Sequence, residues 1–121
     1  MPAKLLSVNA NKSMNFVLQT YLSKSFNFYS AQDVATGAQF LRNGNFDILL
    51  IDIDFAPTDN LEFVQFVQNS VLFNCPIIIL TNELSRVPQK LRKEFCTIIL
   101  KPFNPVHLQQ SISLLVRKQK A

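Results

Sequence analysis

The chain has 121 residues, of which 48% are hydrophobic and 17% are charged, and eleven of them are phenylalanine. This length predicts a single domain over residues 1–121, and the composition excludes a disordered chain, which would have few aromatic residues and many charges. Two glycines exclude a glycine-rich phosphate loop, and two cysteines exclude a disulfide framework or a zinc site. No apolar run approaches the roughly 20 residues of a membrane span. We therefore expect a small soluble domain of the cytoplasm.

Positive charge is concentrated in the last third of the chain. Residues 1–83 carry four positive and seven negative side chains, whereas residues 84–121 carry eight positive and one negative, a net charge of +7. Such a segment is typical of a solvated basic face, and it is also compatible with an acidic partner surface or with weak nucleic-acid binding.

Five short apolar runs have the character of strands. The run Asp47–Ile53 is apolar on both faces, as in a central parallel strand that helices cover on both sides, and Pro76–Thr81 has the same character. In chain order, the expected strands are Leu5–Val8, Phe26–Tyr29, Asp47–Ile53, Pro76–Thr81 and Thr97–Leu100.

Segments of helical period alternate with these strands. The spacing of apolar residues predicts helices over 14–22 and 34–43, the second of which ends at Asn43-Gly44. A third helix is expected to begin at a cap formed by Thr58 or Asp59.

The last two helices differ in how clearly they are marked. Residues 82–95 are less regular, and Pro88 predicts a short helix that begins close to it. The final helix begins at the cap Asn104, with Pro105 in its first position. The alternation of five strands with five helices predicts a doubly wound, flavodoxin-like α/β fold with a parallel sheet in the order 2-1-3-4-5.

Polar residues follow four of the expected strands. Asn9 and Ala10 end the first strand, Asp52 ends the third, Thr81 the fourth and Lys101 the fifth. In a doubly wound sheet these ends meet at one edge, which is where ligands bind. A carboxylate can accept a phosphoryl group, while a hydroxyl and an ammonium can hold its oxygens. The sequence therefore predicts an anion-handling site.

Three motifs on these elements resemble the receiver domains of bacterial two-component response regulators, over about residues 4 to 117. They are Asp47–Ile53 with the following Pro57, Asp59, Leu61 and Glu62, then Pro76–Thr81, and then the turn Lys101–Pro105. The resemblance implies that Asp52 occupies the phosphoacceptor position, Thr81 the switch hydroxyl position and Lys101 the conserved lysine position. It also implies a cis peptide between Lys101 and Pro102.

The chain departs from this family at the end of its first strand, where the family has two adjacent acidic residues. Asn9 offers a neutral amide and Ala10 offers no ligand, whereas Mg²⁺ prefers charged oxygen ligands. We expect Mg²⁺ binding to be weak or lost, with no other cofactor, and we expect Lys101 to pair directly with Asp52. Asp54 is a weak candidate for a replacement metal ligand.

Further departures lie around the expected switch. Asn82 follows Thr81, where the family has a small residue, and Ile98 stands at the family's aromatic switch position. Asn60 is expected to replace the usual glycine of the turn after Asp54. The short stretch that contains Pro88 implies a shortened or displaced fourth helix.

Three functions follow, and none is that of a metabolic enzyme. The leading one is a divergent receiver that acts as a protein-interaction module and binds a sensor kinase or an output domain through residues 84–117. The alternative is a working receiver that a histidine kinase phosphorylates on Asp52. The third, a nucleic-acid-binding module in the basic last third, has no recognised reader motif to support it. A membrane is not an expected partner.

The remaining reactive side chains are expected to have no catalytic role. Cys75 and Cys96 stand at the amino-terminal ends of neighbouring strands, where buried free thiols are expected in a cytoplasmic domain. His107, the single histidine, is expected on the exposed face of the last helix.

Overall fold

The computed structural model describes residues 2–71, 73 and 75–120, and residues 1, 72, 74 and 121 lie outside this description. Strands and helices alternate along the chain. They are β1 (Lys4–Val8), α1 (Lys12–Leu22), β2 (Asn27–Ala31), α2 (Val34–Asn43), β3 (Ile48–Asp52), α3 (Pro57–Asn69), β4 (Ile77–Thr81), β5 (Cys96–Leu100) and α4 (Pro105–Lys120). Two single turns of 3-10 helix, η1 (Leu84–Arg86) and η2 (Gln89–Leu91), lie between β4 and β5.

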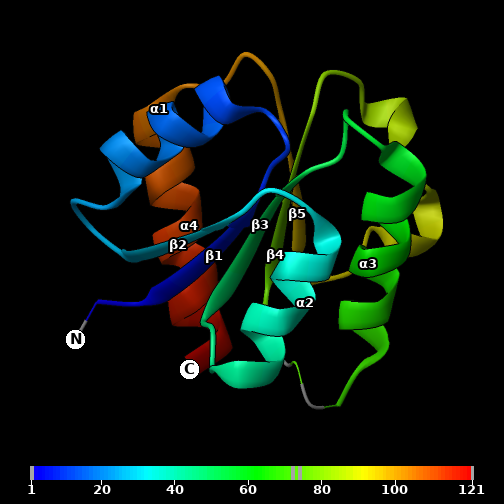
Figure 1. The fold of residues 1–121 in the computed structure, drawn as a ribbon, viewed down its shortest axis with the longest axis horizontal. Coiled ribbons are helices and arrows are strands. Elements are labelled where there is room, and N and C mark those ends of the chain that lie inside the picture. Colours follow the sequence, from blue (N-terminus) through cyan, green and yellow to red (C-terminus); the bar gives the residue numbers. More distant parts are fainter. Residues whose placement is uncertain (1, 72, 74, 121) are drawn as a thin grey trace.

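The five strands form one parallel sheet in the order β2-β1-β3-β4-β5, which confirms the predicted topology. In the register between strands, Val8 is opposite Ile51, Asp52 is opposite Leu80, and Thr81 is opposite Leu100. The carboxyl ends of these strands are therefore level with one another. The loops that leave them gather along the upper edge of the molecule in Figure 1.

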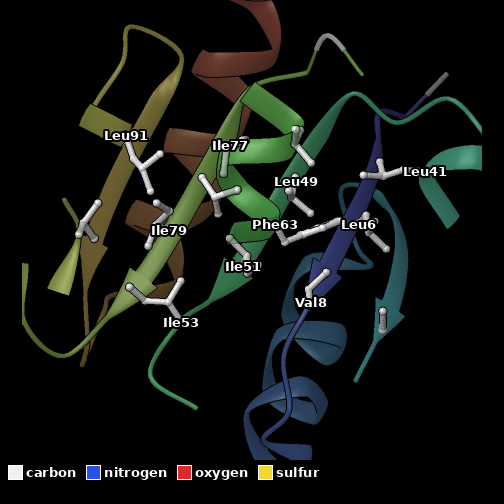
Figure 2. Close-up of a cluster of buried hydrophobic side chains, with 14 residues drawn as sticks. Leu6, Val8, Leu41, Leu49, Ile51, Ile53, Phe63, Ile77, Ile79 and Leu91 are labelled. Carbon is white, nitrogen blue, oxygen red and sulfur yellow. The ribbon is translucent and has the colours of Figure 1, made fainter. Parts of the chain in front are cut away.

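Helices cover both faces of the sheet. In β3, Ile48 and Leu50 face the cluster that α1 and α4 complete, while Leu49 and Ile51 face the cluster that α2 and α3 complete. Figure 1 shows these two helical layers on opposite sides of the sheet, and Figure 2 shows the second cluster, with Phe63 of α3 lying over the strands. Alternate residues of one strand thus enter two different cores, which explains why β3 is apolar on both faces.

The prediction of five helices is wrong, because the described residues contain four α-helices. The expected fourth helix is replaced by η1 and η2. Pro88 immediately precedes η2 and has no N–H to donate to the preceding turn, so a continuous helix cannot cross it. The guanidinium of Arg92 donates instead to the carbonyl oxygens of Leu84 and Val87, which holds the two turns together.

The predicted start of α3 is also wrong. The helix begins at Pro57 after Ala56, whose φ of 56° is left-handed, and no side chain caps it. The expected caps Thr58 and Asp59 therefore lie inside the first turn, because the ring of Pro57 already provides the dihedral of a first helical residue.

Asn60 lies inside α3 and does not take the place of a turn glycine. Its buried side-chain amide donates to the carbonyl oxygens of Phe55 and Ala56, 3.0 Å away in the case of Ala56. The amide thus ties the start of the helix to the loop before it, and the left-handed residue of this turn is Ala56.

Other local predictions fared better. The side chain of Asn104 accepts from the backbone N–H of Val106 at 2.8 Å, as expected of the cap of α4. The peptide between Lys101 and Pro102 is cis, as the resemblance implied. The edge strand β2 begins one residue later and ends two residues later than predicted, and Phe26 packs into the core beside α1 and does not pair.

Candidate functional site

The carboxyl ends of β1, β3, β4 and β5 bring together the side chains that the sequence predicted. Asp52 lies at the centre, and its carboxylate contacts Lys101 and Asn9. Thr81 lies on the next strand and connects to the same group through Asp54. Ala10 is exposed and adds no polar side chain.

The carboxylate of Asp52 is buried and has three hydrogen-bond donors. Its Oδ2 accepts from Lys101 Nζ at 2.8 Å and from Asn9 Nδ2 at 3.4 Å, and its Oδ1 accepts from the backbone N–H of Asp54 at 3.0 Å. The side chain is only 6% exposed. The predicted direct ion pair with Lys101 is thus confirmed.

Asn9 presents its amide nitrogen to Asp52 and keeps its amide oxygen elsewhere. The Oδ1 atom accepts from the backbone N–H of Asn11 at 2.9 Å, and a backbone N–H can only donate, so this assignment identifies the oxygen. The backbone carbonyl of Asn9 in turn accepts from Asn15 Nδ2 at 2.8 Å. The side chain is therefore held in an orientation that places a donor, and no oxygen ligand, against Asp52.

Asp54 turns towards β4 and β5, where its carboxylate receives four donors. Oδ1 accepts from Thr81 Oγ1 at 2.6 Å and from Arg86 Nη1 at 2.8 Å. Oδ2 accepts from the backbone N–H of Asn82 at 2.8 Å and lies 2.8 Å from Lys101 Nζ. A carboxylate has about four lone-pair positions, so this one is fully used.

The electrostatics of the site favour the charged form of both partners. Burial raises the pKa of Asp54, but hydrogen bonds from Lys101, Thr81, Arg86 and the Asn82 N–H outweigh it and lower the pKa to about 2. Burial likewise lowers the pKa of Lys101, but its hydrogen bonds and charge interactions with Asp52 and Asp54 raise it above the ordinary value overall. The two carboxylates are thus balanced by the ammonium of Lys101 and the guanidinium of Arg86.

Thr81 is fully buried, and its hydroxyl is engaged. Because a hydroxyl has one hydrogen, its donation to Asp54 at 2.6 Å leaves its oxygen to accept from the Glu83 N–H at 3.3 Å. The hydroxyl at this position therefore links the end of β3 to the segment after β4.

Sequence reasoning missed Arg86. This residue lies in η1, in the stretch where a helix was expected, and its guanidinium reaches back over the strand ends to Asp54. Its side chain is 38% exposed, and it also lies 3.8 Å from the exposed carboxylate of Glu83. The excess of positive charge after residue 83 was the available signal, but it did not single out this arginine.

The residues outside the strand ends form no second reactive centre in the part of the chain that the structure describes. Cys75 and Cys96 are free and partly buried, and burial together with the charge of Asp47 raises the pKa of Cys75 to about 11. His107 is exposed, as predicted. No cluster of three or more His, Cys, Asp or Glu side chains with metal-binding geometry occurs in the described residues. None of the helices described has the length and apolar character needed to span a bilayer.

Neither a protein-family model nor a curated protein matches the sequence, whereas many solved structures match the fold. The chemotaxis protein CheY4 of Vibrio cholerae is 23% identical, with a TM-score of 0.81 over 95% of this chain and 99% of that one. The signal receiver domain of a signal transduction histidine kinase from Syntrophus aciditrophicus is 18% identical, with a TM-score of 0.83 over 96% and 91%.

A third structure, a response regulator receiver modulated diguanylate cyclase from Pelobacter carbinolicus, is 18% identical, with a TM-score of 0.81 over 98% of this chain and 95% of that one. Each of these three matches covers at least 95% of this chain. The chain therefore has the fold of the receiver domains of two-component response regulators.

Proposed function

We propose that the chain is a divergent receiver domain of a bacterial two-component system that acts mainly as a protein-interaction module. In this proposal, Asp52 stands at the phosphoacceptor position, and Mg²⁺-dependent phosphorylation is impaired. The domain is a signalling module of the cytoplasm and has no metabolic reaction to catalyse.

The direct pairing of Lys101 with Asp52 is the observation that carries this proposal. Phosphoryl transfer to a carboxylate depends on a divalent cation that neutralises charge between the donor and the attacking oxygen. The residues present do not fit such an ion, since Asn9 directs an N–H at Asp52 and Ala10 has no ligand. Asp54, the remaining carboxylate, is saturated by Thr81, Lys101 and their neighbours.

A phosphodonor assay tests the proposal. The purified chain is incubated with Mg²⁺ and acetyl phosphate, and intact-mass spectrometry measures the mass of one phosphoryl group. We expect a negligible phosphorylated fraction in the wild type, equal to that of Asp52→Asn. Stoichiometric phosphorylation of the wild type that is lost in Asp52→Asn would overturn the proposal.

That outcome would instead support the alternative, a working receiver that accepts a phosphoryl group on Asp52 and that a histidine kinase phosphorylates. The convergence of Asp52, Thr81 and Lys101 at one edge of the sheet favours this second function. Mg²⁺ titration separates the two functions, because a working receiver would show a saturable shift of the backbone amides around Asp52 and Asp54.

The proposed partner surface is residues 84–117, with a sensor kinase or an output domain as the partner. This segment combines the basic last third of the chain with five exposed apolar side chains. Phe95 is 37% exposed, and the other four are about half accessible, namely Leu84, Leu100, Val106 and Leu114. One similar structure is the signal receiver domain of a histidine kinase, and another is a receiver modulated diguanylate cyclase. Receivers of this fold thus occur together with both kinds of proposed partner, a kinase and an output domain.

A titration tests this surface. A purified sensor-kinase receiver-binding domain, or an output domain from the same genome, is added to the isotopically labelled chain. We expect the partner to shift the amide signals of η1, β5 and α4. We expect Leu100→Lys to weaken the apparent affinity by about tenfold, because binding would bury an unpaired charge. Shifts confined to α2 and α3 would contradict the assignment.

A further inference from the structure

A small set of anion-binding groups lines the side of the site that faces β4 and β5. It consists of the hydroxyl of Thr81, the backbone N–H of Asn82, the ammonium of Lys101 and the guanidinium of Arg86. Hydroxyl, amide and cationic donors that converge on one point are the chemistry that holds phosphate oxygens. The set is partly shielded from water, since Thr81 is buried and the side chain of Lys101 is 14% exposed.

The carboxylate of Asp54 already occupies this set. Each of its two oxygens has two of the four donors, at distances of 2.6 to 2.8 Å. The side chain is 13% exposed, so water competes weakly for these contacts. An external anion that approached the same donors would have to displace a bound carboxylate and would meet its negative charge.

The loop after β3 explains how Asp54 reaches this position. The Oδ1 atom of Asp52 accepts from the backbone N–H of Asp54, two residues later, which is the hydrogen bond of an Asx turn. This turn ends the strand at Asp52 and directs the Asp54 side chain across to β4. Asp52, at the phosphoacceptor position, thus helps to place the carboxylate of Asp54, which occupies the four donor groups described above.

We propose that Asp54 is a positioning residue that acts as a built-in anion. It occupies the phosphate-binding donors Thr81, Asn82, Lys101 and Arg86, and it keeps the segment from Asn82 to Arg92 in one fixed conformation. The inference rests on the proposed function where it treats Thr81 and Lys101 as phosphate-binding groups. Its structural part, the anchoring of the segment, stands on the contacts alone.

The anchoring follows from what the segment contacts. Arg86 joins it to Asp54, Val87 and Leu91 are buried in the core of the α2 and α3 face, and Arg92 closes the two turns on themselves. The end of the segment nearest the site is held mainly by polar contacts to Asp54 through Thr81, Asn82 and Arg86. Removal of this carboxylate therefore frees the amino-terminal part of the segment while the buried part keeps its place.

Inorganic phosphate tests the occupied-site part of the proposal, in the absence of Mg²⁺ and of any phosphodonor. The amide signal of Asn82 is followed during phosphate titrations of the wild type, Asp54→Ala and the control Glu62→Gln, which removes an exposed negative charge on α3. We expect Asp54→Ala to bind phosphate at least about tenfold more tightly than the wild type, the equivalent of one charge-assisted hydrogen bond. We expect Glu62→Gln to match the wild type.

The gain must depend on the donors that Asp54 leaves free. In Asp54→Ala combined with Lys101→Met, the added affinity is expected to disappear. Equal phosphate affinity in the wild type and Asp54→Ala would overturn this part of the proposal, and so would an equal gain in Glu62→Gln.

Hydrogen exchange in the variant Asp54→Asn tests the anchoring part of the proposal. Asparagine has nearly the same size as aspartate, so the variant is expected to fold. The readout is the exchange of the backbone amides of Arg86 and Val87, which donate to Glu83 and Leu84. We expect these amides to exchange about tenfold faster, the effect of losing one charged hydrogen bond, while the amides of β1 and β3 are unchanged. Unchanged exchange at Arg86 and Val87 would overturn the anchoring.

These outcomes are separate from those of the phosphodonor assay. Phosphorylation of the wild type on Asp52 with a phosphate gain in Asp54→Ala would refute the proposed function and support the built-in anion. A wild type that is not phosphorylated, with no gain in Asp54→Ala, would refute the built-in anion and leave the proposed function standing.

Discussion

The two sides of Asp52 differ in the chemistry that surrounds its carboxylate. On the β1 side, the neighbour is the neutral amide of Asn9, and the next residue, Ala10, is exposed and has no polar side chain. On the side of β4 and β5, Lys101 and Arg86 bring positive charge, and Asp54 brings a second carboxylate. One side has no anionic ligand, and the other has an anion already in place. The two carboxylates and two cations of the site therefore balance one another in charge.

The largest expected effect is that of Lys101→Met, which removes a positive charge from the side of the site that faces β4 and β5. This change leaves the carboxylates of Asp52 and Asp54, 6% and 13% exposed, without the cation between them. We expect a loss of about 3 kcal/mol in the free energy of unfolding, as for a buried ion pair that loses one partner. Urea unfolding at neutral pH measures it. Lys90→Met removes an exposed lysine of η2 as the control, and an equally small loss in both variants would contradict the prediction.

The pH dependence of stability tests the contribution of Asp54 on the same side of the site. Its pKa is about 2 in the folded chain against an ordinary value of 3.8, so its stabilising effect is complete above about pH 4. The effect is lost as the pH falls through the folded value, because the unfolded chain then binds the proton more readily. The shift corresponds to about 2 kcal/mol.

Urea unfolding from about pH 5 to about pH 2, a range that spans both pKa values, measures this slope. In Asp54→Asn we expect the fall in stability over this range to be smaller than in the wild type by about the same 2 kcal/mol. The matched control is Glu62→Gln. An identical pH dependence in the wild type and Asp54→Asn would show that the Asp54 contacts do not contribute to stability.

The β1 side can be tested by restoring what it lacks. Asn9→Asp combined with Ala10→Asp places two carboxylates beside Asp52, and we expect this variant to gain Mg²⁺ binding that, under the proposed function, the wild type lacks. At a Mg²⁺ concentration about ten times the dissociation constant, bound metal should stabilise the fold by about 1.4 kcal/mol. Thermal unfolding with and without Mg²⁺ measures the gain. Asn11→Asp, which adds one negative charge nearby, serves as the control. Equal Mg²⁺ effects in the wild type, the double variant and Asn11→Asp would contradict the expectation that the β1 side lacks metal ligands.

The smallest expected effect is that of Arg86→Met. The guanidinium is 38% exposed, so its ion pair with Asp54 is screened by water, and we expect a loss of less than about 1 kcal/mol in global stability. Hydrogen exchange should nevertheless show faster opening of η1, because Arg86 is its link to Asp54. A global loss as large as that of Lys101→Met would mean that the two cations share the site equally.

The sheet and the ends of its strands were predictable from the sequence, for a physical reason. β3 was predicted within one residue at each end, because a strand that enters two cores is apolar along its length, here from Ile48 to Ile51 before Asp52. Since parallel strands end at one edge, the meeting of Asp52, Thr81 and Lys101 followed from the topology. The cap of α4 was predicted because Asn104 acts through residues next to it in the chain.

The positions that the sequence did not reveal depend on distant contacts. Arg86 and Asp54 are 32 residues apart, and their pairing depends on η1 and η2 replacing a helix. The direction of the Asp54 side chain is fixed by donors at the end of β4 and in the segments that follow β4 and β5, which are far from Asp54 in the sequence. The left-handed Ala56 likewise depends on the packing of the loop and not on the preference of alanine.

The ion pair between Asp54 and Arg86 has a consequence for how this sequence varies in evolution. Because the two side chains contact each other directly, a mutation of either one removes a charged partner of the other, so orthologues should change positions 54 and 86 together. Under the proposed function, position 10 carries no metal ligand and should drift among small and polar residues. An alignment of orthologues with correlated substitution at 54 and 86, and independent substitution at 10, would be the evolutionary record of a site balanced by its own residues.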